Sequence, residues 1–251
     1  QFLVGSEGAL GVITEVLRRP ICKPPSARTA LVHFPRLEGA SRSVHAVLTR
    51  GLVPATLEIL DETAIECIEE AMHLGLPLDV EAILLIESDG SDEESVRREI
   101  DAIADICLEM GASRVEVARS EEERADLWRA RRSVSPSLAR KSPNKLGEDI
   151  TVPRSAIPEA VRRIKAISER YGLPIVVFGH AGDGNLHPNI LFDKRDTEQW
   201  EKVEQIVGEI FQVALDLGGT LSGEHGIGTF KLPYMHQALG PASIDIQWRI
   251  K

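Results

Sequence analysis

Cysteine, basic charge and long apolar runs are all scarce in this sequence. Its 251 residues include three cysteines, Cys22, Cys67 and Cys107, and no CxxC pair. An odd, widely spaced set argues against a disulfide framework or a cysteine-based zinc site and favours a reducing cytoplasm. Lys and Arg total 29 against 39 Asp and Glu, which gives a formal charge of −10. This balance argues against nucleic acid as a partner, because phosphate binding needs a basic surface.

The apolar runs are too short to form a transmembrane helix. The longest, such as 82–86 and 174–178, fall far below the roughly 20 residues that a spanning helix requires. The chain begins at Gln1 inside a glycine-rich stretch and without a signal-type segment, so we expect it to be a piece of a longer polypeptide. Hydrophobic residues make up 43% and charged residues 27%, an ordinary composition for a folded protein of one large or two small domains.

Strands and helices are predicted to alternate after a proline-rich linker that ends near residue 25. Residues 1–20 are typical of a glycine-rich loop running into a strand, and Ser91 with Glu94 predicts a helix-capping box. The pattern of strand, helix and strand appears at least twice, which favours an α+β fold of two ferredoxin-like halves that share a mostly antiparallel sheet covered by helices. A parallel βαβ sheet is the alternative. Strands are expected at 29–34, 55–60, 82–87, 114–118, 147–152, 175–180 and 186–192, and helices at 37–50, 62–74, 91–110, 120–138, 155–171 and 197–217.

Three of the seven histidines lie in two glycine-rich motifs, GHAGDGNLH at 179–187 and SGEHGIG at 222–228. A tight turn between His180 and His187 can bring both imidazoles to one side, and Glu224 is a candidate third ligand. Two histidines and one carboxylate with an open position are typical of catalytic zinc or non-haem iron sites. The alternative is an Asp-Gly hairpin whose histidines only pack.

Two further residues are candidates for proton transfer and for anion binding. His225 follows Glu224 directly, and an imidazole can accept a proton near neutral pH; the alternative is a hydrogen bond to a backbone carbonyl. Arg131 shares a predicted helix face with Trp128. If that face points inward, Arg131 needs an anionic partner such as a substrate carboxylate, with Ser135 one turn further on; the alternative is a solvated face.

The first residues form a glycine-rich stretch, GSEGALGV at 5–12. Such a loop would let the backbone approach a flat or charged cofactor closely. Gly223, Gly226 and Gly228 lack the GxGxxG spacing, and Glu224 would repel a phosphate beside it. Phosphate binding is therefore the weaker interpretation of the second histidine motif.

Taken in order, five motifs resemble those of the FAD-linked oxidases of the vanillyl-alcohol-oxidase type: GSEGALGVITE, WRARR, GEDITVP, GHAGDGNLHPNILF and SGEHGIGTFKLPYM. The branch is the one that contains D-lactate dehydrogenase, D-2-hydroxyglutarate dehydrogenase and the flavin subunit of glycolate oxidase. The resemblance divides the chain into two parts. Residues 1–25 would be the remnant of a truncated FAD-binding domain, with its last strand and a linker, and residues 26–251 the C-terminal substrate domain.

The resemblance implies a flavin-dependent oxidation of a small D-2-hydroxy acid or glycolate to the 2-oxo acid, with hydride transfer to FAD. FAD and a divalent metal (Zn, Mn or Fe) are the implied cofactors, and an iron–sulfur protein is an implied partner subunit. The implied residues are the metal ligands His180, His187 and Glu224, the proton acceptor His225, the substrate-binding Arg131, Ser135 and Asn189, and the flavin-contacting Gly5, Ser6, Gly8, Gly11 and Val12.

Two other functions stay open on the sequence. A metal-dependent hydrolase could use the same two histidines and glutamate with a metal-bound water, although it would leave the glycine-rich start and Arg131 unexplained. A non-catalytic module that binds a partner subunit is the second. The chain on its own is expected to be inactive, because most of the family's FAD-binding domain lies outside it. A cytoplasmic location, with or without peripheral attachment to the inner membrane face, and a homo-oligomer are both compatible with the sequence.

Overall fold

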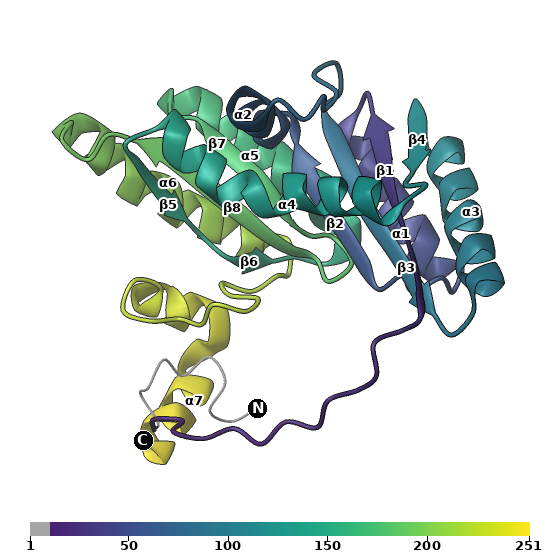
Figure 1. Ribbon diagram of the computed structural model, residues 1–251. Helices are drawn as coiled ribbons and strands as arrows, with labels where there is room; N and C mark the ends of the chain where they lie inside the picture. Colours follow the sequence, from purple (N-terminus) through teal and green to yellow (C-terminus); the bar gives the residue numbers. More distant parts are fainter. Residues whose placement is uncertain (1–10) are drawn as a thin grey trace.

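An antiparallel sheet organises the computed structural model, which describes residues 11–251 (Figure 1). Its strands run in the order β4-β1-β3-β2-β7-β8-β5, with β6 also pairing with β8. Every pairing is antiparallel, so the parallel alternative is wrong. The strands are β1 (Ser26–Phe34), β2 (Thr56–Asp61), β3 (Ala82–Gly90), β4 (Arg114–Val117), β5 (Asn144–Gly147), β6 (Ile150–Thr151), β7 (Ile175–His180) and β8 (Asn185–Phe192).

Helices cover both faces of this sheet. Helices α1, α3, α5 and α6 share one apolar cluster with the first face, and α2 and α4 share another with the second. Figure 1 shows α4 running across the front of the sheet. None of the described helices combines the length and apolar character needed to cross a membrane. The helices are α1 (Leu37–Thr49), α2 (Glu62–Met72), α3 (Glu93–Glu109), α4 (Glu121–Lys141), α5 (Ile157–Tyr171), α6 (Thr197–Asp216) and α7 (Met235–Ile250).

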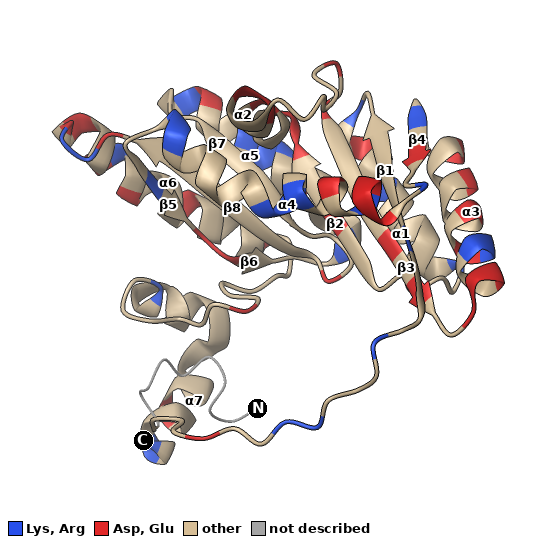
Figure 2. Cartoon of the chain, viewed as in Figure 1, with Lys and Arg blue, Asp and Glu red and all other residues tan. Residues whose placement is uncertain are grey.

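Strand β3 shows why the central strands are continuous apolar runs. Leu84 and Ile86 belong to the cluster under α1 and α3, whereas Ile83 and Leu85 belong to the cluster under α2 and α4. Successive side chains of a strand point to opposite faces, so a strand covered on both sides must be apolar at every position. Most charged residues lie on the outer helices, and Figure 2 shows acidic residues along α3 and at the start of α4. Glu58 and Asp61 of β2 are buried exceptions.

The chain repeats one motif. In the first half, β1, α1, β2, β3, α3 and β4 give the spatial order 4-1-3-2 of a ferredoxin-like unit, with α2 as an added helix. In the second half, β6, α5, β7, β8 and α6 repeat that order, and the fourth strand is reduced to one bridge between Thr151 and Thr220. The expected α+β fold with two ferredoxin-like halves is therefore confirmed.

The two halves join edge to edge where β2 pairs with β7. We call this junction the seam; its register partners run from Glu58–His180 to Leu60–Phe178. Helix α4, which connects the halves along the chain, packs over the seam on the second face, where its Leu138 shares a cluster with Leu60 and Phe178. The seam and α4 together position the candidate site described below.

Two predicted elements differ from the structure near charged residues. Helix α3 is capped by Asp92, whose carboxylate accepts a hydrogen bond from the Ser95 N–H at 2.8 Å, so the capping box of Ser91 and Glu94 was wrong. The strand predicted at 147–152 is split into β5 and β6. The split occurs because Glu148 and Asp149, which lie between the two strands, turn into the interior, where they are 4% and 0% exposed.

The two ends of the chain also depart from the prediction. The last strand of an FAD-binding domain, expected within 1–20, is not formed in 11–20, which has no regular secondary structure; its other part lies outside the described residues. A strand needs a neighbour for its N–H and C=O groups, and this segment instead leaves the sheet at β1 (Figure 1).

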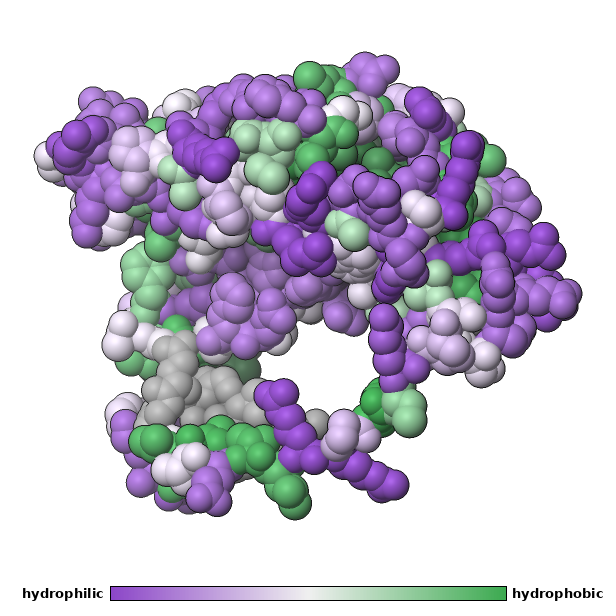
Figure 3. Space-filling model, in the orientation of Figure 1, coloured by the Kyte–Doolittle hydropathy of each residue, from purple (hydrophilic) through white to green (hydrophobic). Residues whose placement is uncertain are grey.

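The sequence did not predict helix α7. This helix is kinked at Gly240, and Pro241 is the next residue; a Gly-Pro pair is typical of turns. Figure 3 shows hydrophobic surface in this lower part of the molecule, where Leu17 and Trp248 are 102% and 66% exposed.

Candidate functional site

The hairpin of β7 and β8 brings two histidines together on the face of the sheet that α4 covers. His180 ends β7, and His187 is the third residue of β8. Their ring centroids lie 5.3 Å apart at an interplanar angle of 88°. Gly179 permits the close approach, since a Cβ there would lie 2.2 Å from the carbonyl oxygen of Asn185. Gly184 makes the turn with a φ of 77°, a conformation that other residues adopt at a cost.

A buried aspartate holds the second histidine motif against this hairpin. Asp149 is 0% exposed, and its Oδ2 accepts hydrogen bonds from the N–H groups of residues 223–225 at 2.9, 3.0 and 2.9 Å and from the Ser222 hydroxyl at 2.7 Å. Its Oδ1 accepts one from the Asn185 amide at 2.5 Å. Burial raises the pKa of Asp149, but these hydrogen bonds outweigh burial and hold the pKa far below its usual range. The backbone N–H groups of residues 223–225 therefore fasten this loop to the Asp149 carboxylate.

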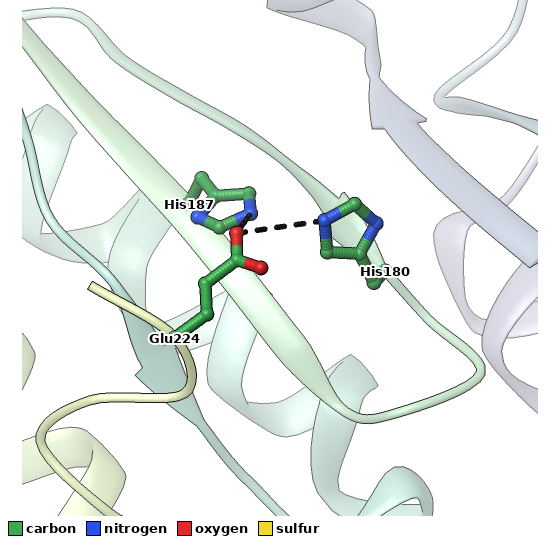
Figure 4. A group of neighbouring side chains, drawn as sticks. All are labelled: His180, His187 and Glu224. Atoms are coloured by element: carbon green, nitrogen blue, oxygen red, sulfur yellow. Dashed lines mark ion pairs between the residues drawn. The ribbon is translucent and has the colours of Figure 1, made fainter. Parts of the chain in front are cut away.

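The anchored loop brings Glu224 to the two histidines (Figure 4). Glu224 Oε1 lies 3.6 Å from His180 Nε2 and 3.4 Å from His187 Nε2. One ligand atom from each residue lies within 4.8 Å of the others. Two ligands about 2.1 Å from a tetrahedral cation lie about 3.4 Å apart, so this donor set fits a divalent metal. The three residues that the sequence selected as ligands are thus brought together.

The two imidazoles differ in their pKa shifts, but both direct Nε2 at Glu224. Burial, and then the charge of His180, lower the pKa of His187 to about 4, so His187 is neutral near pH 7. Its buried Nδ1 has no hydrogen-bond partner among the described residues and lies 4.0 Å from Asp149 Oδ1. The pKa of His180 is raised, chiefly by a hydrogen bond with Glu58. A cation binds the unprotonated nitrogen of an imidazole, and both Nε2 atoms face Glu224.

His225 lies beside the ligand cluster rather than pointing away from it. Its ring stacks on His187 with centroids 5.3 Å apart and planes at 12°. Its Nε2 is 3.7 Å from Glu224 Oε1, and its side chain is 57% exposed. An imidazole in this position is open to solvent on one side and borders the ligand cluster on the other.

Arg131 finds its anionic partner inside the protein. Its Nε is 2.9 Å from Oε2 of Glu58, and its guanidinium lies 5.1 Å from the Phe178 ring centroid. The other carboxylate oxygen of Glu58 is 2.6 Å from His180 Nδ1. Burial raises the pKa of Glu58, but the bond with His180 and the charge of Arg131 leave it lowered. Sequence reasoning missed Glu58, although a single acid in the apolar run TLEIL is a sign of a buried cation.

The remaining expected substrate residues lie around the same face. Asn189 is 5% exposed and donates a hydrogen bond to the His187 carbonyl at 2.9 Å. Ser135 is exposed and accepts a hydrogen bond from Lys145 Nζ. Lys145, which sequence reasoning also missed, is half-buried on β5, has no acidic partner in the described part of the chain, and has its pKa lowered by burial. Arg131, in the middle of α4, and Lys145, on β5, are therefore two cations near the candidate site.

Only two of the five expected flavin-contacting residues lie in the described part of the chain. Gly5, Ser6 and Gly8 lie outside the described residues. Gly11 and Val12 lie on an exposed segment without secondary structure, and Val12 is 82% exposed. The described residues therefore present a fit for a metal but do not by themselves form a flavin pocket.

Comparison with known proteins identifies relatives along the whole chain. The glycolate oxidase subunit GlcD of Bacillus subtilis is 42% identical over 251 residues, covering 100% of this chain and 53% of that protein. GlcD of Escherichia coli K12 is 40% identical, with coverages of 92% and 46%. The probable mitochondrial D-lactate dehydrogenase of Danio rerio is 32% identical, with coverages of 99% and 50%. The chain therefore spans about half the length of the curated relatives it matches.

Solved structures with the same fold are more distant. A substrate-bound p-cresol methylhydroxylase matches with a TM-score of 0.70 at 14% identity, covering 91% of this chain and 50% of that one. An alkyldihydroxyacetonephosphate synthase matches with a TM-score of 0.64 at 15% identity, covering 88% and 44%. At these identities the likeness establishes the fold alone. A model of the family described as "FAD linked oxidases, C-terminal domain" matches residues 23–251. The chain belongs to this family.

Proposed function

We propose that this chain supplies the metal and substrate half of an FAD-dependent oxidation of a small D-2-hydroxy acid or glycolate to the 2-oxo acid. The observation that carries the proposal is the convergence of His180, His187 and Glu224, with His225 stacked beside them. The names of the relatives, glycolate oxidase subunit and D-lactate dehydrogenase, indicate the substrate class. Residues 26–251 would form the substrate domain and 1–25 its link to an FAD-binding domain.

The three clustered residues would hold one divalent cation. The set of two imidazoles and a carboxylate accepts zinc, manganese or iron. When bound, such a cation stabilises negative charge that develops on the substrate hydroxyl oxygen, by several kcal/mol. Glu224 is 51% exposed, so the side of the cluster opposite the sheet is open to a substrate.

His225 would accept the hydroxyl proton. It lies next to the ligand cluster, 3.7 Å from Glu224 Oε1, and more than half of its side chain is exposed. An imidazole placed within reach of the proton contributes roughly 10²–10⁴ in rate. His187 is the less suitable base because it is buried and faces Glu224 through Nε2.

Arg131 would bind the substrate carboxylate, and Ser135, Lys145 and Asn189 would line the same pocket. Glu58 engages Arg131 through Nε, which leaves the Nη groups for the two oxygens of a carboxylate. Holding the carboxylate and the hydroxyl at two separate points fixes which face of the substrate Cα is presented for reaction. A bound FAD would supply the hydride acceptor for the substrate Cα–H, which is flavin chemistry.

The cellular setting is part of the same proposal. The relatives named glycolate oxidase subunit indicate assembly with other subunits, and we propose an iron–sulfur protein as the electron-accepting partner. We place the assembly in the cytoplasm, with peripheral attachment to the inner membrane face as the site of electron delivery.

The test uses the FAD-containing protein that carries this chain, purified without chelator. Metal analysis is expected to find about one divalent ion per chain, and dye reduction is expected with glycolate, D-lactate or D-2-hydroxyglutarate but not L-lactate. Arg131→Lys is expected mainly to raise KM, because lysine lacks the planar fork of the guanidinium. A metal content near zero, or no reduction with any of the four acids, would overturn the proposal. Hydrolytic activity without flavin would favour the metal-hydrolase alternative.

A further inference from the structure

A buried glutamate connects the two parts of the proposed site across the seam. Glu58 is 5% exposed and is the register partner of His180 at the end of the β2–β7 pairing. Its Oε1 is 2.6 Å from His180 Nδ1, and its Oε2 is 2.9 Å from Arg131 Nε. Each carboxylate oxygen therefore holds a different functional side chain, and the reaction proposed above uses only the contact with Arg131.

The contact with His180 decides which nitrogen of the ring faces the cluster. A carboxylate beside Nδ1 keeps the proton on that nitrogen, so the lone pair is left on Nε2. Nε2 is the atom that lies 3.6 Å from Glu224 Oε1. Without Glu58 the ring could turn about its own axis or change tautomer, and its lone pair would no longer be aimed at the shared point.

The contact with Arg131 fixes a long side chain that would otherwise be mobile. The guanidinium is held between the carboxylate of Glu58 and the ring of Phe178, and the arginine side chain is 16% exposed. Because His180 and Arg131 share one carboxylate, a displacement of Glu58 moves both the metal ligand and the carboxylate-binding group. The two parts of the site are therefore kept at a fixed separation by one residue of the first half.

A similar pair on the next strand serves as a comparison. Glu87 of β3 is paired with Arg124 of α4 at 2.9 Å, and it also accepts hydrogen bonds from Trp128 at 2.7 Å and Thr29 at 2.6 Å. Arg124 precedes Arg131 by two helical turns, so both pairs fasten α4 to the sheet. Glu87 contacts no residue of the candidate site in the described part of the chain, and it therefore reports on helix docking alone.

We propose that Glu58 is a positioning residue that aligns the metal ligand His180 and the carboxylate-binding Arg131 with one another. This inference rests on the proposed function. It predicts that loss of the Glu58 charge impairs metal binding and substrate binding together, whereas loss of the Glu87 charge impairs neither.

The test compares Glu58→Gln with Glu87→Gln in the FAD-containing protein. The readouts are the Zn²⁺ dissociation constant of the metal-free protein, measured against a chelating indicator, the KM and kcat for the best hydroxy acid, and the melting temperature. Glu58→Gln is expected to weaken Zn²⁺ binding 10- to 100-fold, the usual effect of losing a carboxylate behind a histidine ligand, and to raise KM. Glu87→Gln is expected to lower the melting temperature while Zn²⁺ binding and KM stay within about twofold of wild type.

Equal Zn²⁺ binding and KM in Glu58→Gln and wild type would overturn the positioning role while leaving the proposed function intact. A wild-type protein that binds no metal and oxidises no hydroxy acid would instead overturn the proposed function. Should Glu58→Gln not fold, Arg131→Leu decides the matter by Zn²⁺ binding alone. Removing the Arg131 guanidinium leaves His180 as the one remaining functional partner of Glu58, so Zn²⁺ binding is expected to tighten severalfold. Unchanged or weaker Zn²⁺ binding would contradict the proposal.

Discussion

The ring of His225 lies parallel to the ring of His187, with centroids 5.3 Å apart and planes at 12°. One ring is 9% exposed and the other 57%. Two imidazoles in contact are therefore placed in opposite surroundings, one buried and one at the solvent edge. This difference is the physical basis for assigning the buried ring to a cation and the exposed ring to a proton.

His225→Ala tests that division of roles. Turnover is expected to fall by roughly 10²–10⁴, the contribution of a positioned base, while the metal content stays at the wild-type level. His45→Ala is a matched control, because His45 is an exposed residue of α1 outside the site. Turnover above a tenth of wild type would show that another group accepts the proton, and loss of metal would make His225 a ligand.

Asp149→Asn tests the anchoring of the ligand loop. The amide has one oxygen, so either the N–H groups of 223–225 or the amide of Asn185 must face an NH₂ group in place of an oxygen. We expect a loss of about 1.5–3 kcal/mol of unfolding free energy, as for a hydrogen bond to a charged group, and weaker Zn²⁺ binding. Urea unfolding and indicator titration measure the two effects. Asp92→Asn, at the exposed cap of α3, should change neither, because asparagine caps a helix as well as aspartate.

Gly179→Ala tests the close approach within the β7–β8 hairpin. The added Cβ would lie 2.2 Å from the carbonyl oxygen of Asn185 and 2.9 Å from Cα of Leu186, so the strands must separate. We expect a loss of about 1–3 kcal/mol in unfolding free energy. We also expect weaker metal binding, because the displaced strand carries the ligand His180 as its next residue. Gly182→Ala is the control, because its Cβ would meet Leu57 at an ordinary 3.6 Å. Equal unfolding free energies for the two variants would show that the hairpin accommodates a Cβ at residue 179 without separation of its strands.

Glu148→Gln tests a buried acid beside Lys231. Burial raises the pKa of Glu148 to about 7 from 4.5, against the opposing charge of Lys231. The folded-state pKa of Glu148 lies above its unfolded-state value. The protonated Glu148 therefore contributes its full stabilisation of the folded state below pH 4.5, and this contribution is lost as the pH rises through about 7. Between pH 5 and pH 8 the wild-type protein is expected to lose about 2–3 kcal/mol through this group.

Urea unfolding at pH 5, 6, 7 and 8 measures that loss for both proteins. The variant lacks the titrating carboxyl, so its unfolding free energy is expected to vary with pH by about 2–3 kcal/mol less than that of wild type. Other groups titrate equally in the two proteins and cancel in the comparison. Parallel pH curves would show that Glu148 is already ionised in the folded state at pH 5.

The sequence predicted the type and sequence order of most elements, because apolar periodicity is a local property. It could not exclude a parallel sheet, since a strand such as β3, buried on both faces, has the same apolar run in either topology. The split between β5 and β6 was also not predictable from periodicity. It is caused by Asp149, whose partners in the loop 222–225 lie more than 70 residues further along the chain.

The candidate site was predictable to a similar extent. The sequence marked His180, His187 and Glu224, because a histidine pair around a glycine-rich turn coincides with a Glu-His dipeptide in a second glycine-rich loop, and two imidazoles with a carboxylate form a typical metal-ligand set. Glu58 was not predicted because it forms its contacts with residues 73 and 122 positions away. A carboxylate in an apolar strand is costly to bury without a cation, so a search for isolated acids in predicted strands would have selected Glu58.

The two repeats of the fold differ most at their fourth strand. In the first half, β4 pairs along Arg114–Val117, but in the second half only Thr220 remains, bridged to Thr151. Had this segment continued as a regular strand, its amide groups would have been engaged by a neighbouring strand. Because the second half lacks this strand, those amides are available to hydrogen-bond Asp149 and hold Glu224 beside the two histidines. The candidate metal site therefore lies where the second half departs from the first.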